Sequence, residues 1–338
     1  MRMLKRKNLW MMSRFRTLYV AVLVMCAVFL SACETVIEID PPDYDPELYI
    51  VSKFSPDSSW VAQLTSTIPL SVHPDSVDIF VHNATVMIYD GDLLVDRLVP
   101  RADSSFWYVS SLNHTPASET LYRIVVEAPG FTSISATSMA PPPPVLLDVD
   151  IEEFDDIEDP FYTEEYRIKF SIENPSGLHY FGFSTFQGSY VDSTLGWESF
   201  SLSTMYIRHD SRRWYCYYED VLNPIGVEVS DGSEYCSIGL LSNRSFQDQS
   251  RIDFELTTNY FENFLGDQEQ PSQDSRFVLL VVQSLSPEYI EYHSSLESQL
   301  DFEGFEEPVN LYSNVEGGRG VFAGSSVSYR VFDLSEME

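Results

Sequence analysis

The sequence predicts a mainly β protein: an N-terminal immunoglobulin-like β-sandwich followed by a second β-rich domain that carries one short helix. Aromatic residues make up 14% of the chain, and strand-length runs rich in Val, Ile, Tyr and Thr recur along it. Pro-Asp, Asp-Gly and Pro-Gly pairs, which favour tight turns, separate these runs. Long apolar runs with a helical period are few, which favours strands over helices.

The first 33 residues form a predicted lipoprotein signal peptide. An apolar run over residues 18–30, in which only Tyr19 carries a polar group, follows six basic residues: Arg2, Lys5, Arg6, Lys7, Arg14 and Arg16. A helix of this length rises only about 20 Å, whereas a membrane span needs roughly 20 residues. We therefore expect export and removal of the segment rather than a retained transmembrane helix.

Leu30-Ser31-Ala32-Cys33 resembles a bacterial lipobox, in which the cysteine thiol receives diacylglycerol and the chain is cut just before it. The resemblance implies lipidation at Cys33, and two or more acyl chains give a lasting membrane anchor. An ordinary secretory signal is the alternative, since Ser31 and Ala32 are small enough for plain cleavage. Residues 34–47 are acidic and contain prolines, which predicts an extended spacer between the membrane and the folded body.

The charge of the chain excludes two classes of partner. Loss of residues 1–33 would leave 14 of the 20 basic residues and all 52 acidic ones, a net charge of −38. Nucleic acid and anionic lipid surfaces repel such a chain, so neither is a predicted partner. The mature chain of about 305 residues is long enough for two domains with real cores. No cofactor is predicted.

Residues 48–140 form the predicted immunoglobulin-like sandwich. Six runs have the composition of strands: LYIVSKF, WVAQLTST, VDIFV, ATVMIYDGDLLVDRLV, FWYVSS and LYRIVVEAPGFTSISATS. The fourth predicts a hairpin with Asp90-Gly91 at its tip. The size and the number of strands are typical of an immunoglobulin-like fold. Four prolines, Pro141–Pro144, end this domain because such a run is extended and stiff.

A proline-rich and acidic linker is predicted over 141–165, and a β-rich C-terminal domain over 166–338. The carboxylates at 148–165 lack the EF-hand spacing, so we expect a solvated segment and leave calcium binding open. Strand runs return at YRIKFSIENPSG, YFGFSTFQ, SRIDFELTT and SRFVLLVVQSL. Ser286 is the predicted N-cap of a helix with Pro287 in its first turn. The apolar face of this helix comprises Leu285, Tyr289, Tyr292, Leu296 and Leu300.

Cys216 and Cys236 are the two cysteines that the mature chain keeps besides Cys33. Export brings them into an oxidising compartment, where a bridge closing a loop of about twenty residues would contribute about 3 kcal/mol. A metal site would need His or further Cys nearby, and none lies between them. We therefore predict a disulfide.

The segment MYIRHDSRRWYCYY, residues 205–218, is the predicted partner-binding site. It holds Arg208, Arg212, Arg213 and Trp214 together with four tyrosines. Protein interfaces favour aromatic residues and Arg over Lys and Asp. The alternative is that the aromatic residues belong to core strands and the arginines pair with nearby carboxylates.

Catalytic motifs are missing from the sequence. It contains no Gly-x-Ser-x-Gly and no His-Glu-x-x-His, and its six histidines are scattered without ligand spacing. The glycines at 317, 318, 320 and 324 lack the lysine and the following helix of a phosphate loop, which favours a turn between two strands. Trp60, Trp107, Trp197 and Trp214 could stack on a ligand, although tryptophan in a β domain is more often core.

The order of lipobox, sandwich, proline break, YRIKFSIENPSGLHYFGF, SLSPEYIEYHSSLE and EPVNLYSNVEGGRGVFAG resembles the exported lipoproteins of Bacteroidota called domain of unknown function 4249. The resemblance covers nearly the whole mature chain, and residues 313–322 are its most specific part. Asn174-Pro175 and Tyr180-Phe181 stand where that family commonly has Asp-Pro and a Tyr pair. The family has no established activity, and its members are often encoded beside TonB-dependent outer-membrane receptors.

The resemblance implies a lipid-anchored outer-membrane protein at the cell surface. Its expected role is a non-enzymatic accessory or binding subunit of a TonB-dependent receptor system, with the receptor and the membrane as partners. Two alternatives stay open. One is a hydrolase with its site in the interdomain cleft, and the other is a structural surface lipoprotein without a ligand.

Overall fold

Strands dominate the structure, a computed structural model, and confirm the mainly β class that the sequence predicts. The structure describes residues 44–69, 72–73, 76–101, 106–153, 164–189, 200–203, 205–208, 215–219, 227–228, 235–236, 238–260, 276–300, 310–334 and 337. For 164, 187–189, 200–238, 259–260 and 297–300 it describes at most the backbone. No helix in these ranges is long and apolar enough to cross a bilayer.

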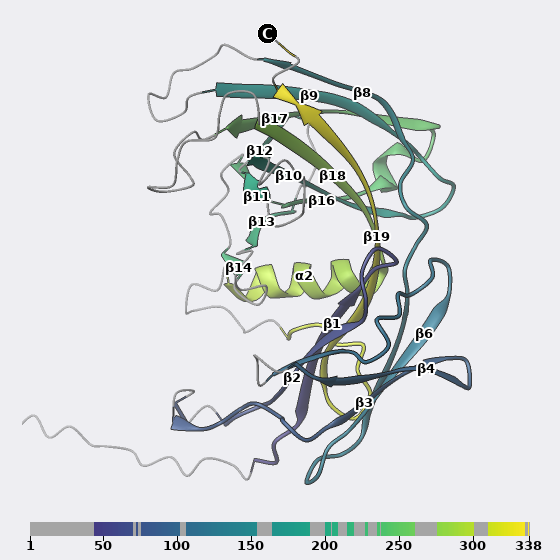
Figure 1. The fold of residues 1–338 in the computed structure, drawn as a ribbon, viewed down its shortest axis with the longest axis vertical. Helices are drawn as coiled ribbons and strands as arrows, with labels where there is room; N and C mark the ends of the chain where they lie inside the picture. The colour runs from purple at the N-terminus through teal and green to yellow at the C-terminus, as the bar shows by residue number, and fades with distance from the viewer. Residues whose placement is uncertain are drawn as a thin grey trace, which may run out of the picture. The chain divides into compact units, whose positions relative to one another are not determined.

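The strands of the first half are β1 (Leu48–Phe54), β2 (Val61–Ser66), β3 (Thr85–Asp90), β4 (Leu93–Pro100), β5 (Trp107–Ser110), β6 (Leu121–Glu127) and β7 (Ile134–Met139). The second half contains β8 (Leu146–Glu153), β9 (Glu164–Glu173), β10 (Tyr180–Ser189), β11 (Phe200–Ser203), β12 (Met205–Arg208), β13 (Tyr215–Glu219), β14 (Val227–Glu228), β15 (Tyr235–Cys236), β16 (Ile238–Ser242), β17 (Arg251–Tyr260), β18 (Arg276–Leu285) and β19 (Arg319–Asp333). The helical segments are η3 (Asn243–Phe246) and α2 (Pro287–Leu300) (Figure 1).

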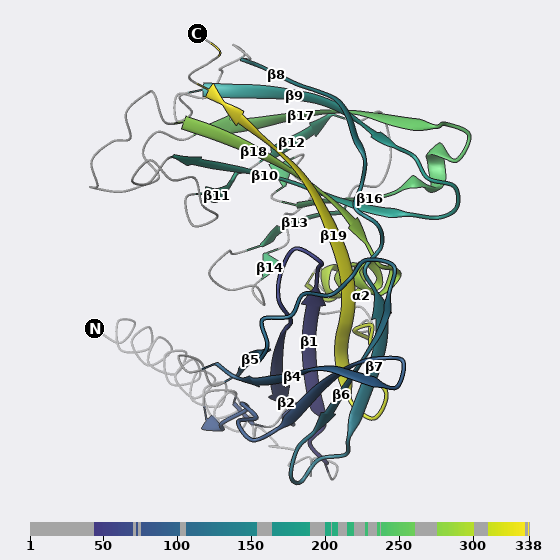
Figure 2. The same ribbon diagram turned by 45° about the vertical axis from the view of Figure 1, so that its right-hand side comes forward.

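The first seven strands curve around one hydrophobic core. They are hydrogen-bonded in the order β1-β2-β5-β4-β3-β6-β7. Ile50 and Leu64 from β1 and β2 share a buried cluster with Ile124 and Ile134 from β6 and β7. Because strands from opposite ends of this path share a core, the sheet folds back on itself (Figure 2). Its assignment as an immunoglobulin-like sandwich stays a prediction.

Two sheets face each other in the second half. One is the five-stranded sheet β15-β12-β17-β9-β8, and the other contains β16, β10 and β18. Alternate residues of these strands point into a shared core, where the rings of Phe170 and Phe183 lie 5.1 and 4.7 Å from that of Phe254. This period of two follows from the strand geometry. The runs that the sequence identified as strands here therefore form the core.

One long strand, β19, connects the two halves. It pairs in parallel with β1 over 319–324 and antiparallel with β18 over 325–333. The sequence predicts a glycine-driven turn between two strands in this stretch, and the structure has a turn at Gly317, where φ is +81°, before the strand begins at Arg319. Gly320 and Gly324 lie within the strand and serve close packing instead: a Cβ at Gly324 would overlap the backbone of Ala140, and one at Gly320, where φ is +118°, would overlap the carbonyl of Ile50.

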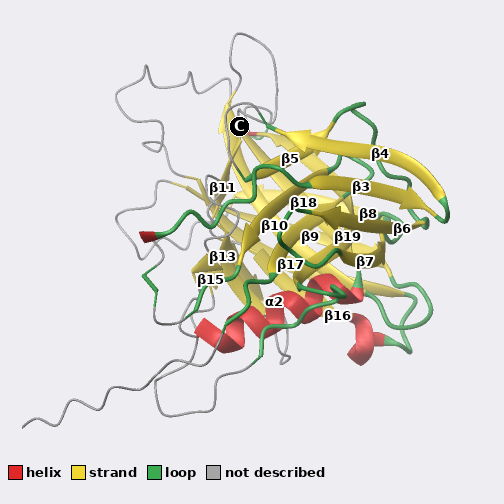
Figure 3. Ribbon diagram, turned by 90° about the horizontal axis from the view of Figure 1, so that it is seen from below, coloured by secondary structure: helices red, strands yellow, loops and turns green. Residues whose placement is uncertain are grey.

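Helix α2, red in Figure 3, lies where the sequence predicts it, directly after β18. Tyr289 and Tyr292 are buried against Leu285 and Val321. The Ser286 carbonyl accepts a hydrogen bond from the Tyr289 N–H. Its hydroxyl accepts one from the Gly324 N–H at 3.3 Å, so the predicted N-cap side chain also holds β19.

The predicted linker differs from the structure over Leu146–Glu153, which is strand β8 and pairs with β9. Leu146, Val149 and Ile151 pack against the second core, and the intervening acidic residues face outward. The high density of carboxylates hid this alternation in the sequence. Residues 154–163 lie outside the described residues, so calcium binding there stays open. The division into domains at 141–165 likewise stays a prediction.

The prediction of a strand at the VDIFV run was wrong. Phe80 makes an isolated bridge with Thr65, and no strand forms over 76–81. By contrast, β1 matches the predicted run at both ends, and β3 and β4 form the hairpin at Asp90-Gly91, where Gly91 has a φ of +56°. A left-handed residue at this position is what a tight hairpin turn requires.

Candidate interaction surface

Most of the site residues predicted from the sequence lie outside the described residues. These are Cys33, Arg212, Arg213 and Trp214. Arg208 is in β12, where its backbone pairs with Glu255 of β17. Cys216 lies in β13 opposite Gly239, and Cys236 lies in β15 opposite Met205. The side chains of Arg208 and of both cysteines lie outside what the structure describes. No disulfide is seen within the described part of the chain. The Cys216–Cys236 disulfide therefore stays a prediction.

The glycine-rich stretch that carries the family resemblance is a structural joint. The Asn314 side-chain amide donates to the carbonyls of Thr137 at 3.2 Å and Phe322 at 2.8 Å, and its oxygen accepts from the Phe322 N–H at 3.0 Å. One side chain thus bonds both β7 and β19. Glu316 and Ser135 also exchange two backbone hydrogen bonds, each N–H donating to the carbonyl of the other residue. No phosphate loop is involved, because β19 follows the glycines where a helix would be needed.

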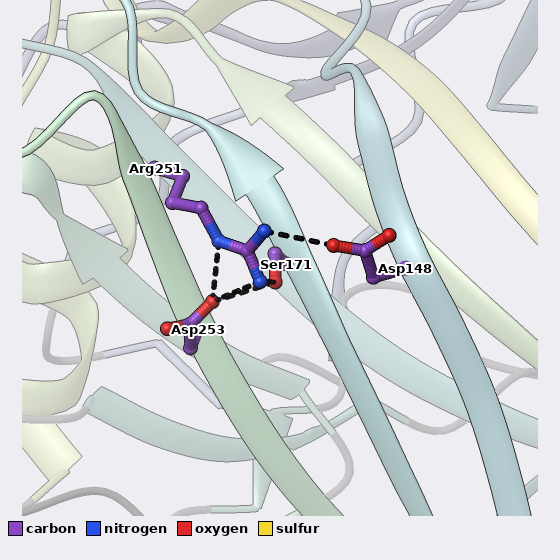
Figure 4. A network of polar contacts seen from close by, with 4 residues as sticks. All are labelled: Asp148, Ser171, Arg251 and Asp253. Atoms are coloured by element: carbon purple, nitrogen blue, oxygen red, sulfur yellow. Dashed lines mark hydrogen bonds and ion pairs between the residues drawn. The ribbon is translucent and has the colours of Figure 1, made fainter.

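A charged network covers the outer face of the five-stranded sheet (Figure 4). Arg251 donates to Asp148 at 2.7 Å, to Asp253 at 2.8 Å and to Ser171 at 2.7 Å. Hydrogen bonds from Ser171 and then Arg251 lower the pKa of Asp253. Hydrogen bonds to Asp253 and Asp148 raise the pKa of Arg251. The single guanidinium is thus held by two carboxylates of the same chain, so the network is an internal contact between strands rather than a recognition site.

Neighbouring basic residues on the same face are also paired. Glu152 of β8 lies 2.7 Å from Lys169 and 3.1 Å from Arg167, both of β9. The hydrogen bond from Lys169 is the main cause that lowers the pKa of Glu152. Arg167 also contacts Glu255 of β17 at 3.2 Å. The ion pairs thus bridge adjacent strands, as cross-strand charge pairs do in sheets.

A serine, a histidine and an aspartate meet in the first half, but not as a nucleophilic site. The Ser110 hydroxyl donates to buried Asp96, and the His114 imidazole accepts from the indole N–H of Trp60 at 3.4 Å. A nucleophilic serine needs its proton held by a basic imidazole. Here Ser110 bonds the carboxylate directly and contacts only the backbone N–H of His114. This arrangement offers no acyl-transfer chemistry.

The outer face of β3, β4, β6 and β7 carries exposed apolar side chains together with arginines. We call this surface the Arg–Tyr face, formed by Tyr89, Leu94, Arg97, Leu121, Arg123 and Met139. Each of these residues alternates along its strand with residues that point into the first core, apart from a bulge beside Leu94. The pairings Tyr89 with Leu94, Tyr89 with Arg123 and Leu121 with Met139 place them side by side.

The chemistry of the Arg–Tyr face differs from that of the charged network. The Arg123 guanidinium lies 4.7 Å from the centre of the Tyr89 ring. Leu94, Leu121 and Met139 keep 44%, 61% and 42% of their surface exposed. Neither Arg97 nor Arg123 makes an ion pair within the described residues, although acidic residues outnumber basic ones 52 to 20. The face thus leaves two cations and three large apolar groups available to a partner.

The tryptophans and the possible metal ligands named from the sequence do not come together in one site within the described residues. Trp60 is fully buried in the first core, Trp107 is half-buried on the opposite side of its sheet, and Trp197 and Trp214 are outside the described residues. Within the ranges that the structure describes, His, Cys, Asp and Glu form no group able to hold a metal ion.

The sequence reasoning missed the Arg–Tyr face. Alternation was the available signal: in LYRIVVE the exposed positions hold Leu121 and Arg123 while Tyr122 and Ile124 are buried. No protein-family model matches this sequence, and no curated protein is significantly similar to it.

Proposed function

We propose that this chain is a lipid-anchored, non-enzymatic accessory or binding subunit of a TonB-dependent receptor system in the outer membrane. The Arg–Tyr face is its docking surface. The signal segment and the lipobox at Cys33 support the membrane attachment. The family resemblance supports the choice of partner.

The observation that carries the docking role is the pair of unneutralised arginines among exposed apolar groups. Arg, Tyr and Met are enriched at protein interfaces, whereas Lys and Asp are depleted. The described cations of the five-stranded sheet's outer face, Arg167, Lys169 and Arg251, are held by carboxylates of the same chain. Arg97 and Arg123 can therefore pair with carboxylates that a partner brings, without breaking contacts within this chain.

Capture of the membrane complex tests this proposal. The full-length protein, tagged at its C-terminus, is purified from detergent-solubilised membranes, and co-purifying TonB-dependent receptors are quantified by mass spectrometry. We expect the Leu121→Ser and Arg123→Ser double variant to lose most of the receptor. Arg251→Ser is the matched control, because it removes an arginine from another outer sheet face whose charges are already paired.

Four outcomes would count against the proposal in different ways. Absence of any such receptor from the wild-type complex contradicts the function itself. Full recovery with the double variant contradicts the Arg–Tyr face as the docking surface. Loss of the receptor with the Arg212→Ser, Arg213→Ser and Trp214→Ser variant alone would instead place docking in residues 205–218. Cys33→Ala should release the protein from the membrane, and continued membrane attachment contradicts the lipid anchor.

A further inference from the structure

A second surface of the first half combines stacked aromatic rings with a buried polar atom that has no partner. It lies on the side of β1, β2 and β5 that faces away from the first core. We call it the aromatic face, formed by Tyr49, Gln63, Phe80, Phe106 and Trp107. It is distinct from the Arg–Tyr face, which β3, β4, β6 and β7 form.

The rings of the aromatic face form a continuous row. Phe80 and Phe106 are stacked, with centroids 4.9 Å apart and planes inclined by 20°. Phe106 lies 5.8 Å from Trp107, and the Arg101 guanidinium lies 5.9 Å from the Trp107 ring. Phe80 remains 37% exposed, and Phe106 and Trp107 are half-buried. These three aromatic rings are therefore partly open to solvent.

Gln63 lies directly beside this row. In the sheet it pairs with Trp107 of β5 on one side and with Val51 of β1 on the other, so the three side chains share a face. Its neighbours Ala62 and Leu64 point into the first core. Gln63 is only 4% exposed, yet its side-chain carbonyl oxygen accepts no hydrogen bond. An enclosed acceptor without a donor is costly, by about 1–3 kcal/mol.

Hydroxyl groups border the face on its other side. Thr65 of β2 pairs with Tyr49 of β1 and makes the bridge to Phe80, which places all three on this face. The Tyr49 hydroxyl lies 2.7 Å from that of Tyr292 on α2. Apolar rings, an unmet acceptor and the Thr65 hydroxyl therefore occur together within one sheet surface, whereas the Tyr49 hydroxyl is already paired with α2.

We propose that the aromatic face binds a neutral saccharide. A sugar ring has an apolar C–H face that stacks on aromatic rings, and it carries O–H donors that can supply the hydrogen bond missing at Gln63. The net charge of −32 disfavours polyanions such as nucleic acid or acidic polysaccharides. This inference goes beyond the proposed function, because it concerns a ligand of the chain itself. Saccharide binding can therefore be measured on the purified protein without any receptor.

The proposal is tested by titrating the detergent-solubilised full-length protein with maltohexaose, cellohexaose and mannohexaose. Binding is measured by calorimetry and by tryptophan fluorescence. We expect saturable binding of at least one of the three. Trp107→Ala and Phe80→Ala should each lower the affinity by about tenfold, the size expected for one stacking ring. Tyr329→Ala, which removes an exposed ring of β19 that belongs to neither named face, is the matched control and should leave the affinity unchanged.

Gln63→Leu separates recognition from packing. Replacing an unsatisfied buried amide by an apolar group of similar size is neutral or stabilising for the fold. We therefore expect an unchanged or higher unfolding temperature together with weaker saccharide binding. The proposal is overturned if none of the three hexasaccharides binds saturably, or if Trp107→Ala, Phe80→Ala and Gln63→Leu all bind as the wild type does.

Discussion

The hydroxyl oxygens of Tyr49 on β1 and Tyr292 on α2 lie 2.7 Å apart. This hydrogen bond joins a strand of the first half to the helix that follows β18. Tyr49 pairs with Arg319 at the start of β19, which changes its partner from β1 to β18 after Gly324. Burial is the main cause that raises the pKa of Tyr49 above its ordinary value, with Tyr292 adding to it. Tyr49 therefore keeps its proton throughout the neutral range.

Removal of either hydroxyl should destabilise the fold modestly. We expect Tyr49→Phe and Tyr292→Phe each to lower the free energy of unfolding by about 1 kcal/mol, the usual net contribution of one hydrogen bond. Because both substitutions remove the same bond, the double variant should lose little more than either single one. Urea unfolding measures this coupling, with exposed Tyr44→Phe as the control. Strictly additive losses would contradict a direct hydroxyl pair.

His293 should make stability depend on pH below neutrality. It is 5% exposed, packs against Tyr289 with ring centroids 4.6 Å apart and contacts Tyr292 with centroids 5.5 Å apart. Burial, and secondarily the charge of Lys53, lowers its pKa well below 6.5. As the pH falls below about 6.5, the unfolded chain binds a proton that the folded one refuses, so stability falls by up to about 1.4 kcal/mol per pH unit.

His293→Phe isolates this contribution, because phenylalanine keeps a ring beside Tyr289 and does not titrate. The stability of this variant relative to the wild type should rise as the pH is lowered from 7 to 5. Chemical unfolding at several pH values measures the difference. A constant difference across this range would show that the titration of His293 is not linked to folding.

Gly324 should tolerate no side chain. A Cβ at this position would meet the backbone of Met139 and Ala140, which cannot move as a flexible side chain could. We expect Gly324→Ala to lower the free energy of unfolding by about 1–3 kcal/mol or more, as overpacking does. Exposed Arg330→Ala on the same strand is the control. A loss under about 0.5 kcal/mol, the range of ordinary surface changes, would contradict close packing of β19 on β7.

Sequence patterns correctly predicted the strands and the helix that a short stretch of neighbouring residues is enough to define. β1 was predicted at both ends because apolar residues alternate from Leu48 to Phe54, and α2 because its apolar spacing follows Ser286 and Pro287. The parallel pairing of β19 was missed because it joins Tyr49 to Arg319, and no residue near either one indicates so distant a partner. Gly317 forms the turn that the glycines predicted, whereas Gly320 and Gly324 lie within the strand and serve packing.

The candidate surfaces depend on the same long-range pairing. Trp107 was named from the sequence as a possible stacking residue, but its neighbour Gln63 became visible only when β5 was placed beside β2. The Arg–Tyr face likewise requires β3 to lie between β4 and β6, which brings Arg123 over Tyr89. The sequence indicated which kinds of residue could form such surfaces. Which of them lie together depends on the order of the strands in the sheet, which the sequence alone did not reveal.

Asn314 provides the sharpest test of the joint between β7 and β19. Its amide donates to the carbonyls of Thr137 and Phe322, and its oxygen accepts from the Phe322 N–H. In Asn314→Asp at neutral pH the acceptor survives, but a carboxylate oxygen now faces two carbonyl oxygens that have lost their donor. Each loss of such a donor costs about 1–3 kcal/mol. We therefore expect Asn314→Asp to be at least as destabilising as Asn314→Ala.

The two variants should separate further when the pH is changed. Protonation of the introduced carboxyl group restores one donor, so the folded chain binds this proton at a higher pH than the unfolded chain, whose Asp pKa is about 3.9. The stability of Asn314→Asp relative to Asn314→Ala should therefore improve as the pH falls towards about 4. Calorimetric unfolding of both variants between pH 3.5 and 7 measures this, with Ser313→Ala as the control that removes only the turn contact to the Val315 N–H. If the Asp variant were as stable as the wild type at pH 7, the amide donors of Asn314 would not hold β7 to β19.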